Sequence, residues 1–375
     1  MRIKCTSFDD MADDIISNNL QIVIFGCGVI GRITSLQILK QYHLQNHLQA
    51  YVDNDSRIWG NWVDDTEVHV PIYNPDEFFN KNVKDNIVVF VGASRYRQIL
   101  DQLENYELIK DAECYLIPIM CLHNYKQIGN DGVVKDYKEP VIPKKIHYIW
   151  LGKKELPYNL KMCIKSWKRF CPDYEIIRWD ESNYDFYSVP YMREAMENNA
   201  FGFAPDYARL DIIYKYGGFY LDTDVEMIRP LDDLRYQEAF CGVETWQTVN
   251  AGGCFGAVPG NDMVHDMIEN REGLHYVYPD GSVNMATCGY YDTMVLIKNG
   301  YKMTGEVQKV GDMTVYPKEF FHPYDYMSGK TDITSNTFSV HRFKGGWMTS
   351  EMRRQNKQMQ ENFEEFCEKI IGENE

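Results

Sequence analysis

Two carboxylates separated by one residue, Asp222 and Asp224, form a pair in this chain suited to hold a cation. Side chains at positions i and i+2 of a strand project to the same face, so both acids could approach one ion. Carboxylate oxygens suit Mg²⁺ or Mn²⁺, and a cation held there could neutralise the charge that grows on a departing diphosphate. The spacing alone is weak evidence, because Asp53 and Asp55 repeat it and a solvated turn would explain either pair.

The residues that precede Asp222 predict a structure that would present it at a site. Residues 206–216 predict a helix that stops at a Gly-Gly pair, a sequence suited to a helix C-terminus. Asp206 and Arg209 stand at i and i+3 on one face of this helix, where they could hold sugar hydroxyls or each other. We expect a strand over 219–228 that carries both acids in the middle of its run.

Four motifs follow one another in the second half of the chain. They are IPKKIHYIWLG (142–152), PDYEIIRWD (172–180), DYARLDIIYKYGGFYLDTDV (206–225) and HRFKGGW (341–347). Together they resemble the family 32 glycosyltransferases, described as a sugar-binding region containing a DXD motif. The resemblance extends over about residues 140–350. It implies a GT-A fold, an α/β nucleotide-sugar domain with a mostly parallel central sheet, and retention of anomeric configuration.

The resemblance also implies a catalytic and metal-binding set. Asp222 and Asp224 would hold the metal and the diphosphate, and Arg209 would complete the catalytic residues. His341 is a further candidate ligand, equally open to a structural role. The family's late motif usually reads His-His and then Ser-Trp, whereas this chain has Arg342 and Gly346 at the matching places. A side-chain contact to the metal or a phosphate is therefore not expected at position 346, and a backbone contact there is left open.

A donor-binding set follows from the same resemblance. Its members would surround the sugar, the ribose, the base and the leaving group; they are Ile149, Trp150, Asp206, Arg209, Tyr220, Asp222 and Trp347. Trp150 would stack on the base, although a tryptophan at the end of a strand also suits a core. Trp347 would act as a lid that excludes water.

The first half of the chain carries a different motif. Gly26-x-Gly28-x-x-Gly31 follows an apolar run and opens a predicted helix, and Asp53 ends the next predicted strand. This is the context of a dinucleotide-binding turn, in which glycines approach a pyrophosphate and the acid contacts a ribose. The same glycines would also serve packing alone. A nucleotide at this first domain is therefore left open.

The order of predicted elements divides the chain in two. We expect a Rossmann-like domain over 1–125, a linker over 126–142 and a GT-A domain with a C-terminal helix over 143–375. Expected strands are 20–25, 48–55, 86–94, 113–119, 144–150 and 174–179, and further expected helices are 97–103, 157–170 and 350–371.

The composition of the chain bears on which classes of partner it could bind. The chain has 39 Lys and Arg against 55 Asp and Glu, a net charge of −16, which disfavours nucleic acid. No apolar run reaches the ~20 residues of a transmembrane helix, and we do not expect the acidic N-terminus to act as a signal peptide. We expect a cytoplasmic protein, with peripheral association at the inner face of the membrane through a lipid-linked substrate left open. The ten cysteines lack zinc-site spacing.

These observations predict a metal-dependent, retaining glycosyltransferase that uses Mn²⁺ or Mg²⁺. The expected donor is a nucleotide sugar, with UDP-sugars favoured. The expected acceptor is a glycan or a lipid-linked glycan in surface or capsular polysaccharide synthesis. Two alternatives remain: an NAD(P)-binding sugar oxidoreductase, against which the lack of a reductase catalytic pair argues, and a non-catalytic sugar-binding scaffold.

Overall fold

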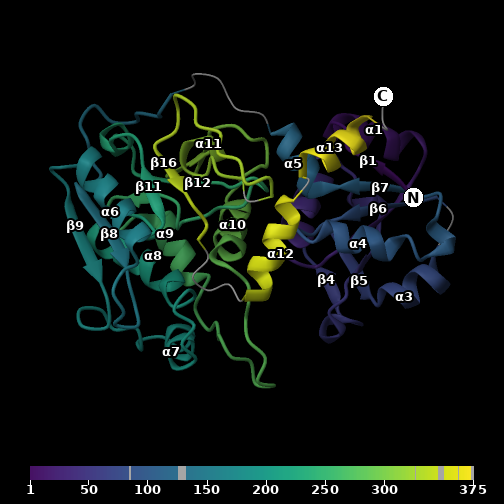
Figure 1. Cartoon of the computed structure of the whole chain (residues 1–375), viewed down its shortest axis with the longest axis horizontal. Coiled ribbons are helices and arrows are strands. Elements are labelled where there is room, and N and C mark those ends of the chain that lie inside the picture. Colours follow the sequence, from purple (N-terminus) through teal and green to yellow (C-terminus); the bar gives the residue numbers. More distant parts are fainter. Residues whose placement is uncertain (84–85, 126–131, 326, 345–349, 362, 373–375) are drawn as a thin grey trace.

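The computed structural model describes residues 1–375 apart from 84–85, 126–131, 326, 345–349, 362 and 373–375. The described chain forms two large sheets that lie side by side, each covered by helices, and one small two-stranded sheet (Figure 1). The N-terminus and the C-terminal helix over 363–372 lie at the sheet built from the first half (Figure 1). None of the described helices is long and apolar enough to cross a lipid bilayer.

The first sheet has seven strands, and all its pairings are parallel except that of β4 with β5. In sheet order the strands are β1 (Arg2–Lys4), β7 (Glu113–Leu116), β6 (Ile87–Val91), β2 (Gln21–Phe25), β3 (Leu48–Val52), β5 (His69–Tyr73) and β4 (Trp62–Asp64). Its α-helices are α1 (Phe8–Ser17), α2 (Leu36–Gln41), α3 (Pro75–Glu77), α4 (Tyr96–Leu103) and α5 (Ile117–Asn124). The central strands are continuous apolar runs because helices cover both faces of the sheet.

Two expectations for this half need correction. The strand expected over 113–119 stops at Leu116, because Pro118 stands in the first turn of α5, where its fixed φ and missing N–H are tolerated. The helix after the glycine-rich turn begins with a π-helical segment, Ile30–Ser35, before α2. Short β1 and β4, three residues each, were not expected from the apolar pattern.

The second sheet also has seven strands but is mixed: three of its six pairings are parallel. In sheet order the strands are β14 (Gln308–Val310), β15 (Met313–Tyr316), β12 (Ala239–Gly242), β13 (Phe255–Ala257), β10 (Gly218–Tyr220), β8 (Lys145–Ile149) and β9 (Glu175–Trp179). Its α-helices are α6 (Tyr158–Phe170), α7 (Pro190–Glu197), α8 (Pro205–Tyr216), α9 (Asp262–Glu269), α10 (Cys288–Lys298) and α11 (Lys318–Phe321). The mostly parallel sheet expected for this half is therefore corrected to a mixed one.

The acid motif does not lie within a strand as expected. The run over 219–228 is split into β10, which ends at Tyr220, and β11 (Val225–Met227), and both acids occupy the turn between them. The physical reason is a partner distant in the sequence. β11 leaves the main sheet to pair with β16 (Ser339–His341) in a separate two-stranded sheet.

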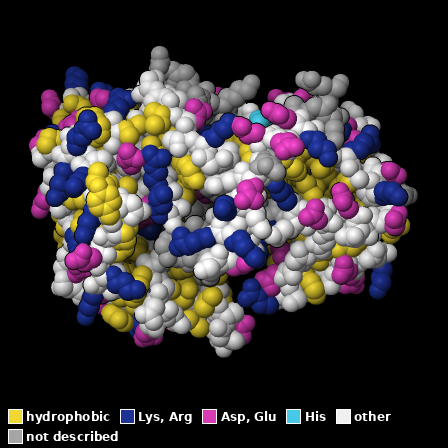
Figure 2. All heavy atoms as spheres, in the orientation of Figure 1, with side chains coloured by type: hydrophobic (Ala, Val, Ile, Leu, Met, Phe, Trp, Pro, Cys, Tyr) yellow, Lys and Arg dark blue, Asp and Glu magenta, His cyan; other side chains and the backbone are white. Residues whose placement is uncertain are grey.

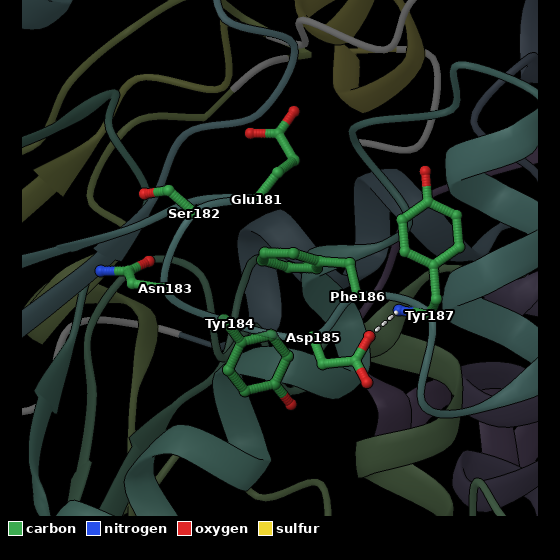
Figure 3. Close-up of a pocket in the computed structure, with 7 residues that line it drawn as sticks. All are labelled: Glu181, Ser182, Asn183, Tyr184, Asp185, Phe186 and Tyr187. Atoms are coloured by element: carbon green, nitrogen blue, oxygen red, sulfur yellow. Dashed lines mark hydrogen bonds between the residues drawn. The ribbon is translucent and has the colours of Figure 1, made fainter.

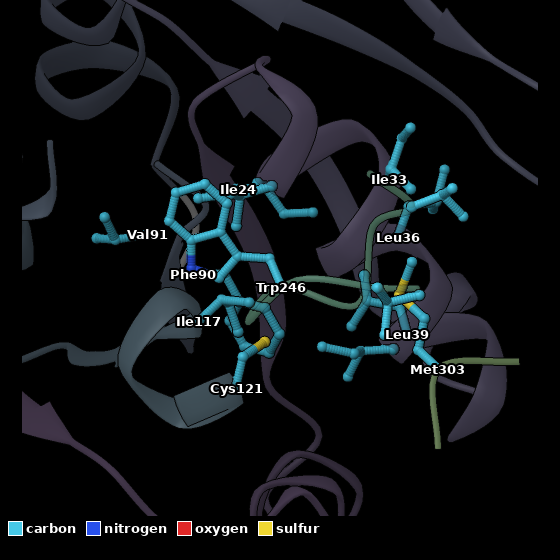
Figure 4. Packing of buried hydrophobic residues seen from close by; sticks show 14 of the residues in the cluster. Ile24, Ile33, Leu36, Leu39, Phe90, Val91, Ile117, Cys121, Trp246 and Met303 are labelled. Carbon is cyan, nitrogen blue, oxygen red and sulfur yellow. The ribbon is translucent and has the colours of Figure 1, made fainter. Parts of the chain in front are cut away.

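The two halves share an apolar core through a tryptophan. The indole of Trp246, in the loop that follows β12, packs among Ile24, Phe90, Ile117 and Cys121 of the first half (Figure 4). Its carbonyl accepts a buried hydrogen bond of 2.8 Å from Thr34 Oγ1, just after the glycine-rich turn. The loop from the second half is therefore anchored in the first.

The C-terminal segment also returns to the first half. The single helix expected over 350–371 is two helices, α12 (Ser350–Gln360) and α13 (Phe363–Gly372), and α13 lies beside β1 (Figure 1). The ring of Phe366 lies 5.4 Å from that of Tyr96, and the Arg97 guanidinium stacks over it at 4.8 Å. The division into two domains stays a prediction, with this helix placed against the first.

Acidic and basic side chains alternate over both lobes on the face shown in Figure 2, with apolar side chains in small groups between them.

Short 3-10 turns cover Gln45–His47, Ser56–Ile58, Glu107–Ile109 and Asp232–Arg235, and a second π-helical segment covers Phe78–Asn82.

Candidate active site

The turn between β10 and β11 brings three candidate ligands together. Oxygen atoms of Asp222 and Asp224 and a ring nitrogen of His341 all lie within 4.8 Å of one another. The turn is closed by a 3.0 Å hydrogen bond from Val225 N to Asp222 O. His341 reaches the site because β16 pairs with β11 and places it opposite Val225.

Asp224 and His341 form a buried ion pair. His341 Nε2 lies 3.3 Å from Asp224 Oδ1, and the Lys344 amide donates to Asp224 Oδ2 at 2.7 Å. Burial opposes ionisation of Asp224, but His341 and the Lys344 amide outweigh burial and hold its pKa below the ordinary value. Burial likewise opposes the charge of His341, yet Asp224, with help from Asp222, raises the pKa of His341. Opposite charges therefore stabilise each other here.

Arg209 joins the acid motif to helix α8. Its guanidinium Nη2 lies 3.0 Å from Asp206 Oδ1 and 3.7 Å from Asp222 Oδ1, and it stacks over the Tyr220 ring at 5.1 Å. Burial disfavours the charge of Arg209, but Asp222 foremost raises its pKa well above the ordinary value. The side chain of Arg209 is 5% exposed, whereas that of Asp222 is 30% exposed. A permanent cation therefore stands behind a carboxylate that solvent or a ligand can reach.

Asp206 has a different charge state. Burial raises its pKa to about 6, even though Arg209 and Arg271 lower it. Arg271 belongs to a second buried ion pair, 2.8 Å from Asp292 of α10. Asp206 can therefore carry a proton in mildly acidic solution, when it would donate rather than accept a hydrogen bond.

Glycines allow backbone to approach this cluster closely. A Cβ at Gly252 would lie 2.1 Å from Asp222 Oδ2, and one at Gly253 would lie 2.0 Å from His322 Nε2. Gly252 O also accepts a 2.8 Å hydrogen bond from the Asp222 amide. The backbone at Gly252 and Gly253 therefore approaches side chains of the site itself.

The structure adds a neighbour that sequence reasoning left unassigned. Cys288 Sγ, at the first residue of α10, lies 3.6 Å from Arg209 Nη1. The signal in the sequence was Thr287-Cys288-Gly289 before a helix, which carries no chemistry without this contact. His322 was also missed, because only the fold brings it to 5.6 Å from His341, ring to ring.

The predicted base-binding residues lie at the neighbouring strand. β8 runs parallel to β10, so Ile149 and Trp150 emerge at the same edge of the sheet as Asp222. Ile149 is buried, and half-buried Trp150 donates from Nε1 to the Lys154 carbonyl at 2.6 Å. Tyr220 is buried and donates to Asp222 Oδ1 at 3.0 Å. The ligand-binding roles of these residues stay predictions.

A pocket adjoins this edge of the sheet. It is lined by residues 181–187, after β9, and Figure 3 shows their side chains around it. Glu181 Oε1 accepts a 2.8 Å hydrogen bond from Gly152 N. The pocket is therefore next to the segment that holds Ile149 and Trp150, and not at the three-residue cluster.

The end of the late motif falls partly outside the description. Trp347, the predicted lid, lies outside the described residues, as does Gly346. Arg342, which replaces the family's second histidine, pairs with Glu226 at 2.5 Å. The Arg342 side chain therefore bonds along the small sheet, whereas its backbone amide donates to the Asp224 carbonyl at 3.2 Å.

The glycine-rich motif of the first half is engaged within its own fold. A Cβ at Gly31 would lie 1.9 Å from Gly26 O, and one at Gly26 would lie 2.8 Å from Gly92 O, so these glycines permit backbone packing. Gly28 meets nothing within 4 Å. Asp53 Oδ2 accepts from Cys27 N at 2.6 Å and Oδ1 accepts from Asp55 N at 2.8 Å. Nucleotide binding there stays a prediction.

The chemistry of the three-residue cluster fits a divalent cation. Two carboxylates and an imidazole suit Mn²⁺, and Mg²⁺ accepts the carboxylates. His341 Nδ1 is buried without a hydrogen-bond partner among the described residues. A second group of possible ligands, His265, Asp266 and Glu269, is exposed on α9, where solvated side chains explain it.

Comparison with known proteins bears on this region. Residues 157–241, which include Asp206, Arg209, Asp222 and Asp224, match the family model described as glycosyltransferase sugar-binding region containing DXD motif. The similarity supports a glycosyltransferase. It confirms the predicted resemblance to DXD glycosyltransferases at this level.

Relatives with known roles agree with that class. The chain is 31% identical over 196 residues to inositol phosphoceramide mannosyltransferase 3 of Schizosaccharomyces pombe (strain 972 / ATCC 24843), covering 48% of this chain and 54% of that one. It is 30% identical over 129 residues to α-1,4-N-acetylglucosaminyltransferase of Homo sapiens, covering 34% of each. The chain thus spans about half the length of the first relative and a third of the second. The relatives support an enzyme of the hexosyltransferase class.

One solved structure, PaToxG glycosyltransferase, aligns with 55% of this chain and 77% of its own at 16% identity and a TM-score of 0.34.

Proposed function

We propose that this chain is a metal-dependent glycosyltransferase of GT-A type that moves a sugar from a nucleotide-sugar donor to a glycan or lipid-linked glycan. The observation that carries the proposal is the convergence of Asp222, Asp224 and His341 beside the buried Arg209. Retention of configuration, a UDP-sugar donor and a role in surface or capsular polysaccharide synthesis are the finer parts of the proposal, supported by the four motifs alone.

In this proposal Asp222, Asp224 and His341 would hold Mn²⁺ or Mg²⁺, which supplies a Lewis acid to the donor diphosphate when bound. For His341 to ligate, it must first lose the proton that Asp224 favours. Arg209 adds a fixed positive charge within 3.7 Å of Asp222, where it stabilises negative charge on the leaving group. Asp206 orients Arg209 and accepts a hydrogen bond from a sugar hydroxyl when ionised.

The sugar transfer follows from these positions. The bond from the anomeric carbon to the phosphate oxygen breaks, and the acceptor oxygen bonds to the carbon on the same face. The acceptor's proton passes to the leaving phosphate. A sugar adduct trapped on an Asp or Glu of this protein would contradict this front-side route.

The test is release of nucleoside diphosphate from a panel of UDP-sugars and GDP-sugars, with Mn²⁺, with Mg²⁺ or with EDTA. We expect turnover of one donor, abolished by EDTA and in both the Asp222→Ala and Asp224→Ala variants. A panel without turnover and without metal-dependent nucleotide binding would favour the scaffold alternative.

A further inference from the structure

A half-buried carboxylate at the same edge of the sheet has no part in the route above. Glu244 follows β12 by two residues. β12 and β10 both run antiparallel to β13, which lies between them, so β12 and β10 run in the same direction. Their carboxyl ends therefore reach the same edge of the sheet, and Glu244 emerges at the edge that also presents Asp222.

The loop after β12 fixes the position of this carboxylate. Glu244 N donates to Thr248 O at 2.9 Å, and Thr248 Oγ1 donates to Glu244 Oε1, also at 2.9 Å. The loop is held at its far side, where Tyr301 OH donates to Gln247 O and Gln247 Oε1 accepts from Gly305 N. Trp246 anchors it in the core of the first half. The side chain of Glu244 is therefore held by a rigid loop rather than a mobile one.

Short links connect this loop to the candidate ligands. Asn250 N donates to Gly242 O at 3.0 Å, and Asn250 Oδ1 accepts from Gly252 N at 3.0 Å. Gly252 in turn bonds to the Asp222 amide and lies against its carboxylate.

The ionised form of Glu244 lacks a fixed cation. No Lys or Arg of the described chain forms an ion pair with it; the groups that favour its ionised form are Thr248, His341 and Asn250, and burial raises its pKa despite them. Ionising a half-buried acid is costly when no fixed positive charge lies beside it. Such a group in a site commonly meets a charge that a ligand supplies.

We propose that Glu244 is a catalytic residue whose carboxylate contacts the donor sugar at the anomeric centre and stabilises the positive charge that develops there. This inference rests on the proposed function. As the anomeric carbon separates from the phosphate oxygen, its ring gains positive charge, and a carboxylate fixed beside it lowers the energy of that state. Glu244 forms no covalent bond in this step, because the acceptor oxygen takes the carbon and the phosphate takes the acceptor's proton.

The test compares two carboxylates at opposite ends of one strand. Glu244→Gln removes the charge but keeps an acceptor for Thr248, and Glu238→Gln makes the same change just before β12, where Glu238 bonds to Tyr137. Turnover would be measured with the donor that the wild type uses best. Binding of its nucleoside diphosphate with Mn²⁺ would be measured by calorimetry.

We expect Glu244→Gln to lower kcat at least 100-fold, with Kd and Tm close to the wild-type values, and Glu238→Gln to change neither. A kcat within tenfold of the wild type, or a loss of binding that matches the loss of kcat, would overturn the inference. A sugar adduct on Glu244 would overturn its non-covalent form. If Glu244→Gln fails to fold, Glu244→Asp, which withdraws the charge by one methylene, gives the same comparison of kcat with Kd. A wild type that turns over no donor would contradict the proposed function itself. An active wild type with an equally active Glu244→Gln variant would contradict only this inference.

Discussion

The two acid motifs of this chain have the same spacing and opposite surroundings. Asp53 accepts hydrogen bonds from two backbone amides of its own fold, and Asp55 pairs with Arg57 at 2.6 Å. Asp222 and Asp224 instead converge on the imidazole of His341. The first motif closes a loop, whereas the second gathers groups that share the chemistry of metal ligands.

The difference arises from partners that are far apart in the sequence. Asp55 finds Arg57 two residues away, whereas Asp224 meets His341 through the pairing of β11 with β16. Glycines follow the same division. Gly31 allows one backbone segment to pack on another, and Gly252 allows backbone to pack on the Asp222 carboxylate. The spacing of two acids therefore does not by itself indicate a metal site; the residues that the fold brings close to them do.

The largest expected effect is on turnover. Asp222→Asn should lower kcat about a thousandfold, because several kcal/mol of charge stabilisation depend on the cation site. Asp53→Asn should stay within about threefold, since its partners are structural amides. Nucleoside diphosphate release at saturating donor measures both. An Asp222→Asn enzyme with a tenth of wild-type kcat would remove the contrast between the motifs.

The glycine contrast comes next. Gly31→Ala should destabilise the protein by about 3 kcal/mol, because its Cβ would meet the Gly26 carbonyl, a backbone atom that cannot rotate away. Gly252→Ala should instead displace the Asp222 side chain and reduce kcat about 10- to 100-fold with a smaller loss of stability. Urea unfolding and donor turnover would be measured for both variants. A larger loss of kcat in Gly31→Ala and a larger loss of stability in Gly252→Ala would contradict this prediction.

The protonation of Asp206 gives a smaller effect that depends on pH. Its pKa is raised from 3.8 to about 6 in the folded protein, so the folded state binds more protons than the unfolded state between these values. Stability from the neutral carboxyl is present below pH 4 and is lost as pH rises through about 6. Relative to Asp206→Asn, the wild type should lose about 2 kcal/mol over this range. Unfolding free energies of both proteins at pH 4 to 7 test this, and a constant difference would show that Asp206 is ionised throughout.

The smallest effects belong to the first motif itself. Asp53→Ala should cost about 1–2 kcal/mol, because two amides lose their acceptor. Asp55→Ala should cost less than about 1 kcal/mol, since its ion pair with Arg57 is largely exposed. Thermal unfolding ranks the two variants. Equal losses of stability in the two variants would mean that the two amide hydrogen bonds to Asp53 stabilise the loop no more than the ion pair of Asp55 does.

Much of the fold could be predicted where a strand is a continuous apolar run. The expected ranges contain β2, β3, β6, β8 and β9. A strand that is buried on both faces is recognisable as an uninterrupted run of apolar residues. The three- and four-residue strands β12, β14 and β15 are too short to show a period. Their existence depends on neighbours in the sheet.

The residues of the site also differ in how far they could be predicted from the sequence. Asp206, Arg209 and Asp222 lie within one stretch of sequence, so a helix, a glycine pair and a strand predicted their approach. Glu244, Cys288 and His322 come from separate elements, and nothing local distinguishes them from ordinary core residues. The placement of the acids mid-strand was wrong because the partner of β11 lies more than a hundred residues downstream.

The most direct measurement is anomalous diffraction from crystals grown with Mn²⁺ and the nucleoside diphosphate of the preferred donor. The account predicts a manganese peak between Asp222, Asp224 and His341, with the diphosphate bound to the metal and Arg209 nearby. A peak at Asp53 and Asp55 with none at the second motif, or a nucleotide bound at the first half alone, would contradict it.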